Sequence, residues 1–334
     1  MRRSVDDTPE SVPHLTIGVD IGGTKVVAGV VDSDGHVIAR VLNQTPDRSK
    51  SPTVVEDTIV VSVQELATSY DVHAVGVGAA GFVDTTGSTV MFSPHLSWRD
   101  EPLRAALESR LGVPVLVDND ANTTAWAELR FGAARGFQQM LCITLGTGIG
   151  GALVIDGRVF RGANGMAGEF GHMQVVPEGR RCECGNRGCW EQYSSGNVLV
   201  REARELVEAQ SPAAHQLREL VEGDASRLTG SIVTEAARAG DPTAIEMFRE
   251  IGDWLGTGLA SLTAAFDPEV IIIGGGVSDA DDLLLDPARE ALSRKLTGRG
   301  FRPAPPVLKA ELGPDAGFIG AADLARLALA DGLL

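Results

Sequence analysis

The sequence predicts an α/β protein built from two similar units, and two stretches of the chain carry that prediction. Residues 15–41 (LTIGVDIGGTKVVAGVVDSDGHVIARV) and residues 139–160 (QMLCITLGTGIGGALVIDGRVF) share one pattern: strand, glycine turn, strand, Asp-Gly turn, strand. Because the pattern recurs in the same order, an internal duplication is the economical explanation. At 334 residues the chain also exceeds the size at which single hydrophobic cores usually stop growing, which favours two domains.

Helical and apolar segments alternate after each of these stretches. In the first half, helical spacing of apolar residues predicts a helix at 53–70, and an apolar run predicts a strand at 72–84. A helix over 100–112 and a strand over 114–120 follow. The second half is predicted to hold helices within 196–266, a strand at 269–276, a helix at 281–296, a strand at 306–312 and a last helix at 316–329.

Composition and charge exclude several classes of function. Apolar residues make up 43% of the chain, and the formal net charge is −16. A nucleic-acid surface needs clustered Lys and Arg to neutralise phosphates, so this acidic balance argues against one. No apolar run precedes Leu15, and no eighteen consecutive residues are apolar. The sequence therefore predicts a cytoplasmic protein with no membrane association and a disordered polar tail at 1–13.

Three of the four cysteines fall within eight positions of one another, in the stretch CECGNRGC. In a reducing compartment, Cys182, Cys184 and Cys189 are better interpreted as metal ligands than as disulfide partners, and His172 lies ten residues earlier. Three thiolates and one imidazole suit tetrahedral zinc, and four protein ligands would make that zinc structural. Free thiols or a redox pair are the alternative. Cys142, in an apolar context, is predicted to lie in the core.

Three glycine-rich segments end predicted strands: 20–24 (DIGGT), 145–151 (LGTGIGG) and 271–278 (IIIGGGVS). A hairpin turn would explain each one alone. Together they indicate backbone N–H groups that face a polyphosphate, because glycine lets the backbone approach an anion. LGTGIGG contains a G-x-G-x-x-G match, but a strand rather than a helix follows it, so a dinucleotide fold is not favoured.

Side chains in these segments fit the same ligand. Asp20 makes sense near phosphates if it holds a hydrated Mg²⁺ ion that bridges protein and ligand. The hydroxyls of Thr24 and Thr147 are further donors to phosphate oxygens. Lys25 either pairs with a phosphate or faces solvent.

Asp118, Asn119 and Asp120 fall where a strand gives way to a helix. In open α/β sheets the carboxyl ends of strands line the ligand crevice. One interpretation is that Asn119 or Asp120 is a helix N-cap and has no further role. The alternative is that Asp120 accepts the proton of a substrate hydroxyl as that hydroxyl attacks phosphorus, while Asn119 orients the substrate.

Two more carboxylates flank the cysteine cluster. Glu169 lies with His172 in GMAGEFGH, and Glu191 directly follows the last cysteine in CWEQ. A metal between them would fix their separation, which suits a ligand with many hydroxyls. Both glutamates can also be interpreted as surface charges.

Taken together, the motifs resemble the ROK family of sugar kinases and repressors, and most closely its bacterial ATP-dependent glucokinases. The match runs from about Leu15 to Leu329. The motifs that carry it are DIGGTK, GVGAAGFVD, DNDAN, LGTGIGG, GEFGHMQVVPEGRRCECGNRGCWEQYSSG and IIIGGGVS.

The resemblance implies an actin-like, hexokinase-type (ribonuclease H-like) duplicated fold of two α/β domains with a central cleft. The expected small domain comprises residues 14–121 and about 318–334, and the expected large domain comprises 122–317 with a zinc-binding loop at 172–189. Asp120 matches the general base for the 6-hydroxyl of the sugar. The positions matching sugar contacts are Gly81, Asn119, Asp120, Glu169, His172 and Glu191. Those matching nucleotide contacts are Asp20, Gly22, Gly23, Thr24, Lys25, Gly146, Thr147, Gly148, Gly274, Gly275 and Gly276. The resemblance also implies that His172 serves twice, with one ring nitrogen on zinc beside the three cysteines and the other toward the sugar.

The expected activity is phosphoryl transfer from ATP to glucose, with Mg²⁺ and structural Zn²⁺, by a homodimer or homotetramer. His95 departs from the family, in which many glucokinases carry asparagine, so sugar selectivity stays open and another hexose or an N-acetylhexosamine is an alternative substrate. Polyphosphate is the alternative donor, although it would favour a basic track that this acidic chain lacks. A sugar-responsive repressor is the remote alternative, because such members carry an N-terminal helix-turn-helix domain and about 14 polar residues precede the first strand here.

Overall fold

The computed structural model describes residues 15–94 and 96–334, and contacts among them divide the chain into two compact units. The first unit runs up to Ala127 and includes Gly317–Leu334, and the second is Glu128–Ala316. This boundary after Ala127 lies in helix α3 (Asp120–Arg130), and the boundary expected after residue 121 lies in the same helix. The tail expected at 1–13 and the unusual residue His95 both lie outside the described residues.

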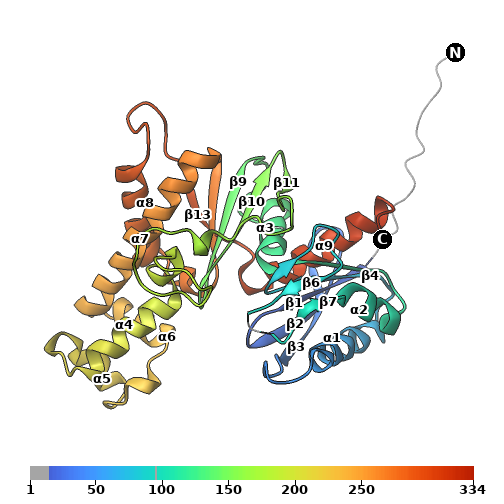
Figure 1. Cartoon of the computed structure of the whole chain (residues 1–334), viewed down its shortest axis with the longest axis horizontal. Coiled ribbons are helices and arrows are strands. Elements are labelled where there is room, and N and C mark those ends of the chain that lie inside the picture. Colours follow the sequence, from blue (N-terminus) through green and yellow to red (C-terminus); the bar gives the residue numbers. More distant parts are fainter. Residues whose placement is uncertain (1–14, 95) are drawn as a thin grey trace. The chain divides into compact units, whose positions relative to one another are not determined.

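The first unit contains a five-stranded sheet with the order β3-β2-β1-β4-β8 (Figure 1). Its strands are β1 (Leu15–Ile21), β2 (Lys25–Val31), β3 (Val37–Gln44), β4 (Val72–Ala79) and β8 (Val115–Asn119). β1, β2 and β3 form an antiparallel meander, and β4 and β8 are added in parallel to β1. The strand–turn–strand pattern of the sequence thus forms the meander as predicted.

The second unit repeats this topology with the order β11-β10-β9-β12-β13. Its strands are β9 (Met140–Leu145), β10 (Ile149–Ile155), β11 (Arg158–Val159), β12 (Val270–Gly274) and β13 (Val307–Lys309). The meander is again antiparallel, and β12 and β13 are again parallel to β9. The predicted internal duplication is therefore confirmed strand by strand.

The strand register refines the correspondence between the two glycine turns. β1 and β9 end at Ile21 and Leu145, so the turn 22–24 corresponds to the turn 146–148. The five-residue segments 20–24 and 146–150 are thus offset by two positions rather than directly equivalent. Asp20 pairs with a glycine of β4 in the parallel register, and Thr144 pairs with a glycine of β12 in the same way. A carboxylate in one sheet therefore has a hydroxyl as its counterpart in the other.

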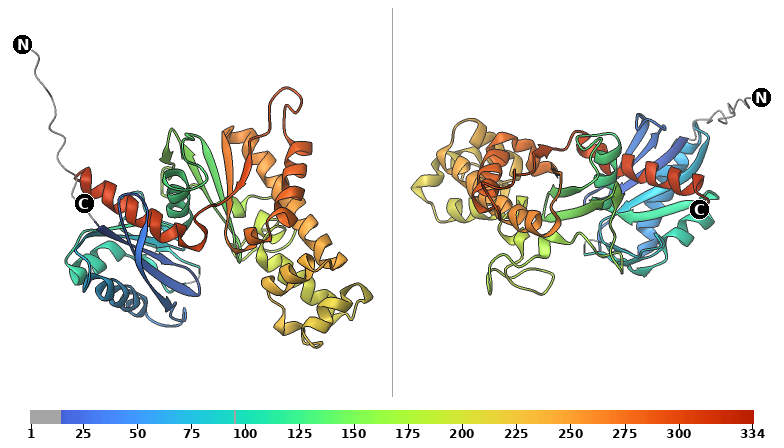
Figure 2. Two further views of the ribbon diagram at one scale, coloured as in Figure 1. Left: turned by 180° about the vertical axis from the view of Figure 1, so that it is seen from behind. Right: turned by 90° about the horizontal axis from the view of Figure 1, so that it is seen from above.

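Four helices belong wholly or largely to the first unit: α1 (Pro52–Ala67), α2 (Leu103–Leu111), α3 and α9 (Ala316–Ala330). α9 packs so closely on the sheet that the strands have glycine beneath it (Figure 2). A Cβ atom on Gly18 would overlap the carbonyl group of Phe318, and one on Gly76 would overlap that of Ala321. The alternate strand residues face the other way and pack with α1 in the core, as a pleated sheet requires.

The helical region predicted within 196–266 resolves into four α-helices of the second unit, and α8 follows β12. They are α4 (Gly196–Glu208), α5 (His215–Leu220), α6 (Gly230–Arg238), α7 (Pro242–Phe266) and α8 (Asp282–Lys295). α7 is 25 residues long and packs along α8. Among the described residues, no helix combines the length and the apolar character that crossing a membrane would require.

A small third sheet in the first unit was not predicted. It consists of the short strands β5 (Phe82–Val83), β6 (Val90–Phe92) and β7 (Arg99–Glu101). Because β7 pairs with β6, the helix predicted from residue 100 begins only at Leu103. It ends as predicted at Gly112, which adopts the left-handed conformation (φ 71°).

Candidate active site

Asn119 caps helix α3 at the carboxyl end of β8. Its side-chain oxygen accepts hydrogen bonds from the backbone N–H groups of Ala121 (2.9 Å) and Asn122 (3.1 Å). Its side-chain nitrogen donates to the carbonyl oxygen of Gly81 at 3.0 Å. Asn119 therefore caps the helix, and its amide has a second N–H with which to contact a ligand.

Asp120 begins α3 and lies close to Asp20 at the end of β1. One carboxylate oxygen of Asp120 accepts from the N–H of Ala121 at 2.9 Å, and the side chain is half-buried. Burial, followed by the charge of Asp120, raises the pKa of Asp20 to about 7. A cation between the two carboxylates would relieve this repulsion, which is the electrostatic setting that a Mg²⁺ site needs.

The first turn of α9 closes over Asp20. A Cβ atom on Gly317 would lie 2.6 Å from the carboxyl carbon of Asp20, so the helix begins directly against that side chain. A helix N-terminus favours negative charge nearby. It therefore opposes the effects of burial and of Asp120 on this carboxylate.

Gly81 lies where two loops of the first unit meet. A Cβ atom there would overlap the carbonyl oxygen of Phe92 and would lie 3.0 Å from the Cα atom of Ser93. The hydroxyl of Ser93 donates to the carbonyl of Ala80 at 2.6 Å. The structure thus joins Gly81, Asn119, Asp120 and Asp20 in one region of the first unit.

The turn at Gly22–Thr24 leaves part of its backbone free for a ligand. The N–H of Gly22 donates to the carbonyl of Lys25 at 3.0 Å, so this amide is already used inside the turn. Gly23, Thr24 and Lys25 are exposed. The donors that this turn can present to a phosphate are therefore those of the three exposed residues.

In the second unit, two glycine segments and the start of α4 lie together. The carbonyl of Gly146 accepts the N–H of Gly196, the first residue of α4, at 2.9 Å. Gly275, with φ 82°, lies against the end of β9, where a Cβ atom would come 2.7 Å from the backbone nitrogen of Leu145. Gly274 and Gly276 flank it, and Thr147 is exposed in the first segment. This grouping offers backbone N–H groups and a helix N-terminus to an anion.

Glu169 and His172 are held on strand β10. A Cβ atom on Gly151 would overlap the ring of Phe170, and one on Gly171 would overlap the carbonyl of Ile149. The segment therefore lies flat on the strand because glycines occur at both contacts. His172 Nε2 lies 3.9 Å from a carboxylate oxygen of Glu169.

His172, Cys182, Cys184 and Cys189 form one cluster, with one ligand atom from each lying within 4.8 Å of the others. Cys182 Sγ lies 3.6 Å from His172 Nδ1, and Cys184 Sγ lies 3.6 Å from Cys189 Sγ. The edge of a tetrahedron with zinc–sulfur bonds of 2.3 Å is about 3.8 Å. The chemistry and the spacing of these four side chains therefore fit zinc. Cys142, by contrast, is fully buried in the core, as predicted.

Glu191 joins this cluster to the glycine turn. One carboxylate oxygen lies 3.0 Å from Cys182 Sγ and 3.6 Å from His172 Nδ1. The other faces Gly148, where an added Cβ atom would come within 2.5 Å of it. Gly148, which is expected to contact the nucleotide, thus also makes room for Glu191, which is expected to bind the sugar. The second unit brings Glu169, His172 and Glu191 together at the cluster.

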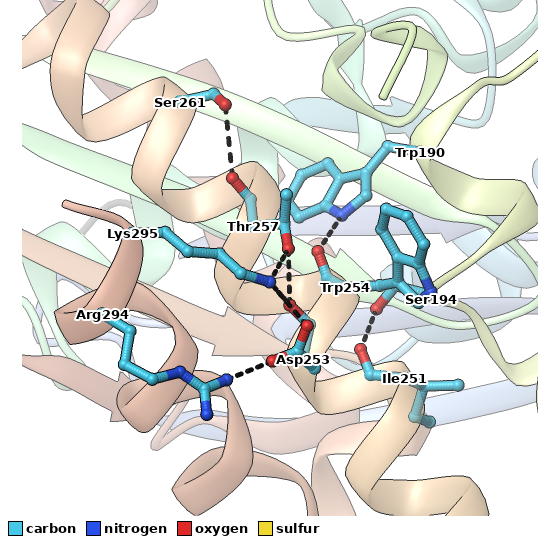
Figure 3. A network of polar contacts seen from close by, with 9 residues as sticks. All are labelled: Trp190, Ser194, Ile251, Asp253, Trp254, Thr257, Ser261, Arg294 and Lys295. Atoms are coloured by element: carbon cyan, nitrogen blue, oxygen red, sulfur yellow. Dashed lines mark hydrogen bonds and ion pairs between the residues drawn. The ribbon is translucent and has the colours of Figure 1, made fainter. Parts of the chain in front are cut away.

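No motif or spacing pattern singled out Trp190, yet its side chain makes contacts that hold this loop. Trp190 is fully buried, and its indole N–H donates to the carbonyl of Trp254 in α7 at 2.8 Å (Figure 3). The only signal in the sequence was a large aromatic residue in a polar loop, directly after a cysteine.

Comparisons with known proteins give the family of the chain. The model of the ROK family matches residues 16–328. Glucokinase of Streptomyces coelicolor is 47% identical over 312 residues, which cover 93% of this chain and 98% of that protein. A crystal structure of a ROK family glucokinase from Streptomyces griseus, in complex with glucose and AMPPNP, is 49% identical with a TM-score of 0.87, and covers 94% of this chain and 99% of that one. The ROK hexokinase of Thermus thermophilus is 34% identical with a TM-score of 0.74, over 95% of this chain and 100% of that one. Since the family model spans nearly the whole described chain, the protein belongs to the ROK family.

Proposed function

We propose that the protein is an ATP-dependent glucokinase, which transfers the terminal phosphoryl group of ATP to the 6-hydroxyl of glucose. The observation that carries this proposal is the likeness, over almost the full length of both chains, to the Streptomyces griseus glucokinase crystallised with glucose and AMPPNP. The arrangement of acidic residues supports it. The half-buried carboxylate of Asp120 at the start of α3 supports its proposed role as a base, and several further acceptors suit a polyol.

Asp120 is the proposed catalytic residue. Its carboxylate accepts the proton of the 6-hydroxyl as that oxygen attacks the terminal phosphorus, and the bond from this phosphorus to the bridging oxygen of ATP breaks. Asn119 orients the sugar through its free amide hydrogen. Capping by Asn119 and the hydrogen bond from Ala121 hold both side chains at the start of α3.

Glu169, His172 and Glu191 are the proposed acceptors for the other sugar hydroxyls. Their side chains are 38%, 33% and 17% exposed, so they are accessible yet partly shielded from water. Nδ1 of His172 faces the cysteines, which leaves Nε2 for the sugar on the side of Glu169. In the first unit, the carbonyl of Gly81 accepts a hydrogen bond from the amide of Asn119, the proposed sugar contact there.

The proposed cofactors follow from the donor sets. His172, Cys182, Cys184 and Cys189 would hold a structural zinc ion, since four protein ligands leave no open position. Asp20 would hold hydrated Mg²⁺, which supplies positive charge to the phosphates of ATP when bound. The proposed ATP contacts are Gly22, Gly23, Thr24, Lys25, Gly146, Thr147, Gly148, Gly274, Gly275 and Gly276. Assembly as a homodimer or homotetramer and action in the cytoplasm, without nucleic-acid or membrane partners, belong to the same proposal.

Turnover across a matrix of acceptors and donors tests this function. The acceptors are glucose, mannose, fructose and N-acetylhexosamines, and the donors are ATP and inorganic polyphosphate. The largest kcat/KM is expected for glucose with ATP, and the product is expected to carry phosphate on the 6-oxygen. A larger kcat/KM for another acceptor, or for polyphosphate, would reassign the substrate or the donor. If no phosphoryl group is transferred to any of these acceptors, the proposed function is wrong.

A further inference from the structure

Trp190 lies between Cys189 and Glu191 in the chain but has neither of their proposed roles. Cys189 before it is a proposed zinc ligand, and Glu191 after it is a proposed sugar ligand. The indole of Trp190 contacts α7 instead, where its N–H donates to the carbonyl of Trp254 at 2.8 Å (Figure 3). Because the whole side chain is buried, this hydrogen bond has no water to replace it.

Helix α7 has a notch that fits the indole. A Cβ atom on Gly258 would overlap three carbon atoms of the Trp190 ring system, Cδ2, Cε2 and Cζ2. Gly258 is in the interior of a 25-residue helix, where glycine costs up to about 1 kcal/mol relative to alanine. The close approach of the Trp190 ring accounts for a glycine at this place.

Two more residues of the same segment are attached to α7. The hydroxyl of Ser194 donates to the carbonyl of Ile251 at 2.8 Å, and this bond is buried. The ring of Tyr193 lies 4.9 Å from that of Trp254, centroid to centroid. The segment that follows Cys189 is thus fixed to two turns of α7 by side chains that bind no metal.

The other two proposed sugar-binding residues of the loop have a different support. Glu169 and His172 lie on β10, where Gly151 and Gly171 allow close packing. The four-residue cluster links the two supports, since it contains His172 from one segment and Cys189 from the other. The loop therefore has two anchors of its own, and the cluster connects them.

We propose that Trp190 is a positioning residue of the glucose site: by attaching the backbone to α7 it holds the carboxylate of Glu191 in place, in addition to the contacts of that carboxylate with Cys182 and His172. This inference rests on the proposed function, because it assigns Glu191 to glucose. The proposal gives the sugar-binding loop two supports. β10 supports the segment that carries Glu169 and His172, whereas α7 supports the segment that carries Glu191.

The chain offers a matched control on another face of α7. Asp253 forms ion pairs with Arg294 and with Lys295 of α8, the latter at 2.5 Å, and Lys295 also donates to Thr257 at 2.6 Å (Figure 3). Asp253 and Thr257 are one turn apart on the side that faces α8. Asp253→Asn therefore weakens the attachment of α7 without touching the loop.

The test compares Trp190→Phe, which keeps an aromatic ring but removes the N–H donor, with Asp253→Asn. Trp190→Phe is expected to raise KM for glucose about fivefold to tenfold, which corresponds to one lost buried hydrogen bond, with little change in kcat or in KM for ATP. Zinc content should stay at that of the wild type. Asp253→Asn should lower the melting temperature and leave KM for glucose unchanged. If Trp190→Phe does not fold, Gly258→Ala, which fills the notch, takes its place.

A double-mutant cycle separates positioning from general stability. If Trp190 acts through Glu191, Trp190→Phe should have little further effect on KM in a Glu191→Gln background. Additive effects in that background, an unchanged KM in Trp190→Phe, or a rise in KM that appears only with loss of zinc would overturn the proposal. A wild-type protein that phosphorylates no sugar would instead contradict the proposed function, and the two failures are therefore distinguishable.

Discussion

The two units share one sheet topology but support their functional residues in different ways. In the first unit, Asp20 ends a central strand and Asp120 begins a helix, so both are fixed by regular hydrogen bonding and by an N-cap. In the second unit, the register position of Asp20 is occupied by Thr144, and the acidic residues lie on an irregular loop. That loop is held by glycine contacts to β10, aromatic contacts to α7 and a Cys₃His cluster.

With the proposed roles, the proton acceptor Asp120 begins a regular helix, whereas the sugar ligands Glu169, His172 and Glu191 lie on a supported loop. Groups on regular elements have their positions set by backbone geometry, which suits a residue that transfers a proton. A loop can place several acceptors around a polyol, but it needs added supports to hold them. We therefore expect a change at Asp120 to lower kcat, and changes in the loop supports of the second unit to raise KM.

The largest effect is expected from Asp120→Asn. The variant keeps an oxygen that accepts from the N–H of Ala121 but loses the basic carboxylate, so kcat should fall about 10²-fold to 10⁴-fold. The melting temperature and the binding of glucose should remain near those of the wild type, which steady-state kinetics and calorimetry would measure. Near-normal turnover in a folded Asp120→Asn protein would show that another group accepts the proton.

Cys184→Ser probes the loop of the second unit. Loss of one thiolate from the cluster should remove stoichiometric zinc, lower the melting temperature, and raise KM for glucose about tenfold or more as the loop loosens. Elemental analysis and kinetics measure the three outcomes. Cys142→Ala, which alters a buried thiol outside the cluster, should retain zinc. Full zinc content in Cys184→Ser would remove that cysteine from the ligand set.

Asp20 gives the first unit a pH dependence that Thr144 cannot give the second. The pKa of Asp20 is raised to about 7 in the folded protein. The stability that this side chain contributes is therefore fully present below its unfolded-state pKa and is lost as the pH rises through about 7. Without Mg²⁺, Asp20→Asn should thus increase stability above pH 7 by about 1 to 2 kcal/mol, less than the full shift implies because the side chain is only half-buried. Thermal unfolding from pH 4 to pH 8 measures this. Parallel stability profiles for the two proteins would contradict it.

The smallest effect is expected from His95→Asn. This change introduces the residue that the family resemblance leads us to expect at this position. We expect the ratio of kcat/KM between glucose and mannose to change less than about tenfold, since the exchange of one polar group is worth about 1 kcal/mol. A competition assay at pH 6 and pH 8 measures it. A complete change of substrate would mean that this position controls selectivity.

The sequence predicted the features that depend on local patterns. The two meanders, the Asp-Gly turns and the helix ending at Gly112 each follow from residues next to one another in the chain. The four residues of the Cys₃His cluster were also found, because cysteine and histidine carry a clear chemical signal within a short span. Their role in holding zinc, and the sugar contacts of Glu169 and Glu191, remain predictions.

Features that depend on distant contacts could not be predicted. The strand pair of β6 and β7 joins short segments with no apolar alternation, so it shortened the helix expected from residue 100. The attachment of Trp190 to α7 joins residues 64 positions apart and depends on a notch at Gly258. Such an interior glycine indicates a close contact, but it does not say which residue fills the space.

The most direct test of the division between the two units is a side-by-side measurement of kcat and KM for glucose in Asp120→Asn and Cys184→Ser. The account predicts that Asp120→Asn loses activity almost entirely in kcat, whereas Cys184→Ser loses it mainly through a higher KM. If both variants lose the same parameter, or if the pattern is reversed, the assignment of reaction to the first unit and recognition to the loop of the second unit is wrong.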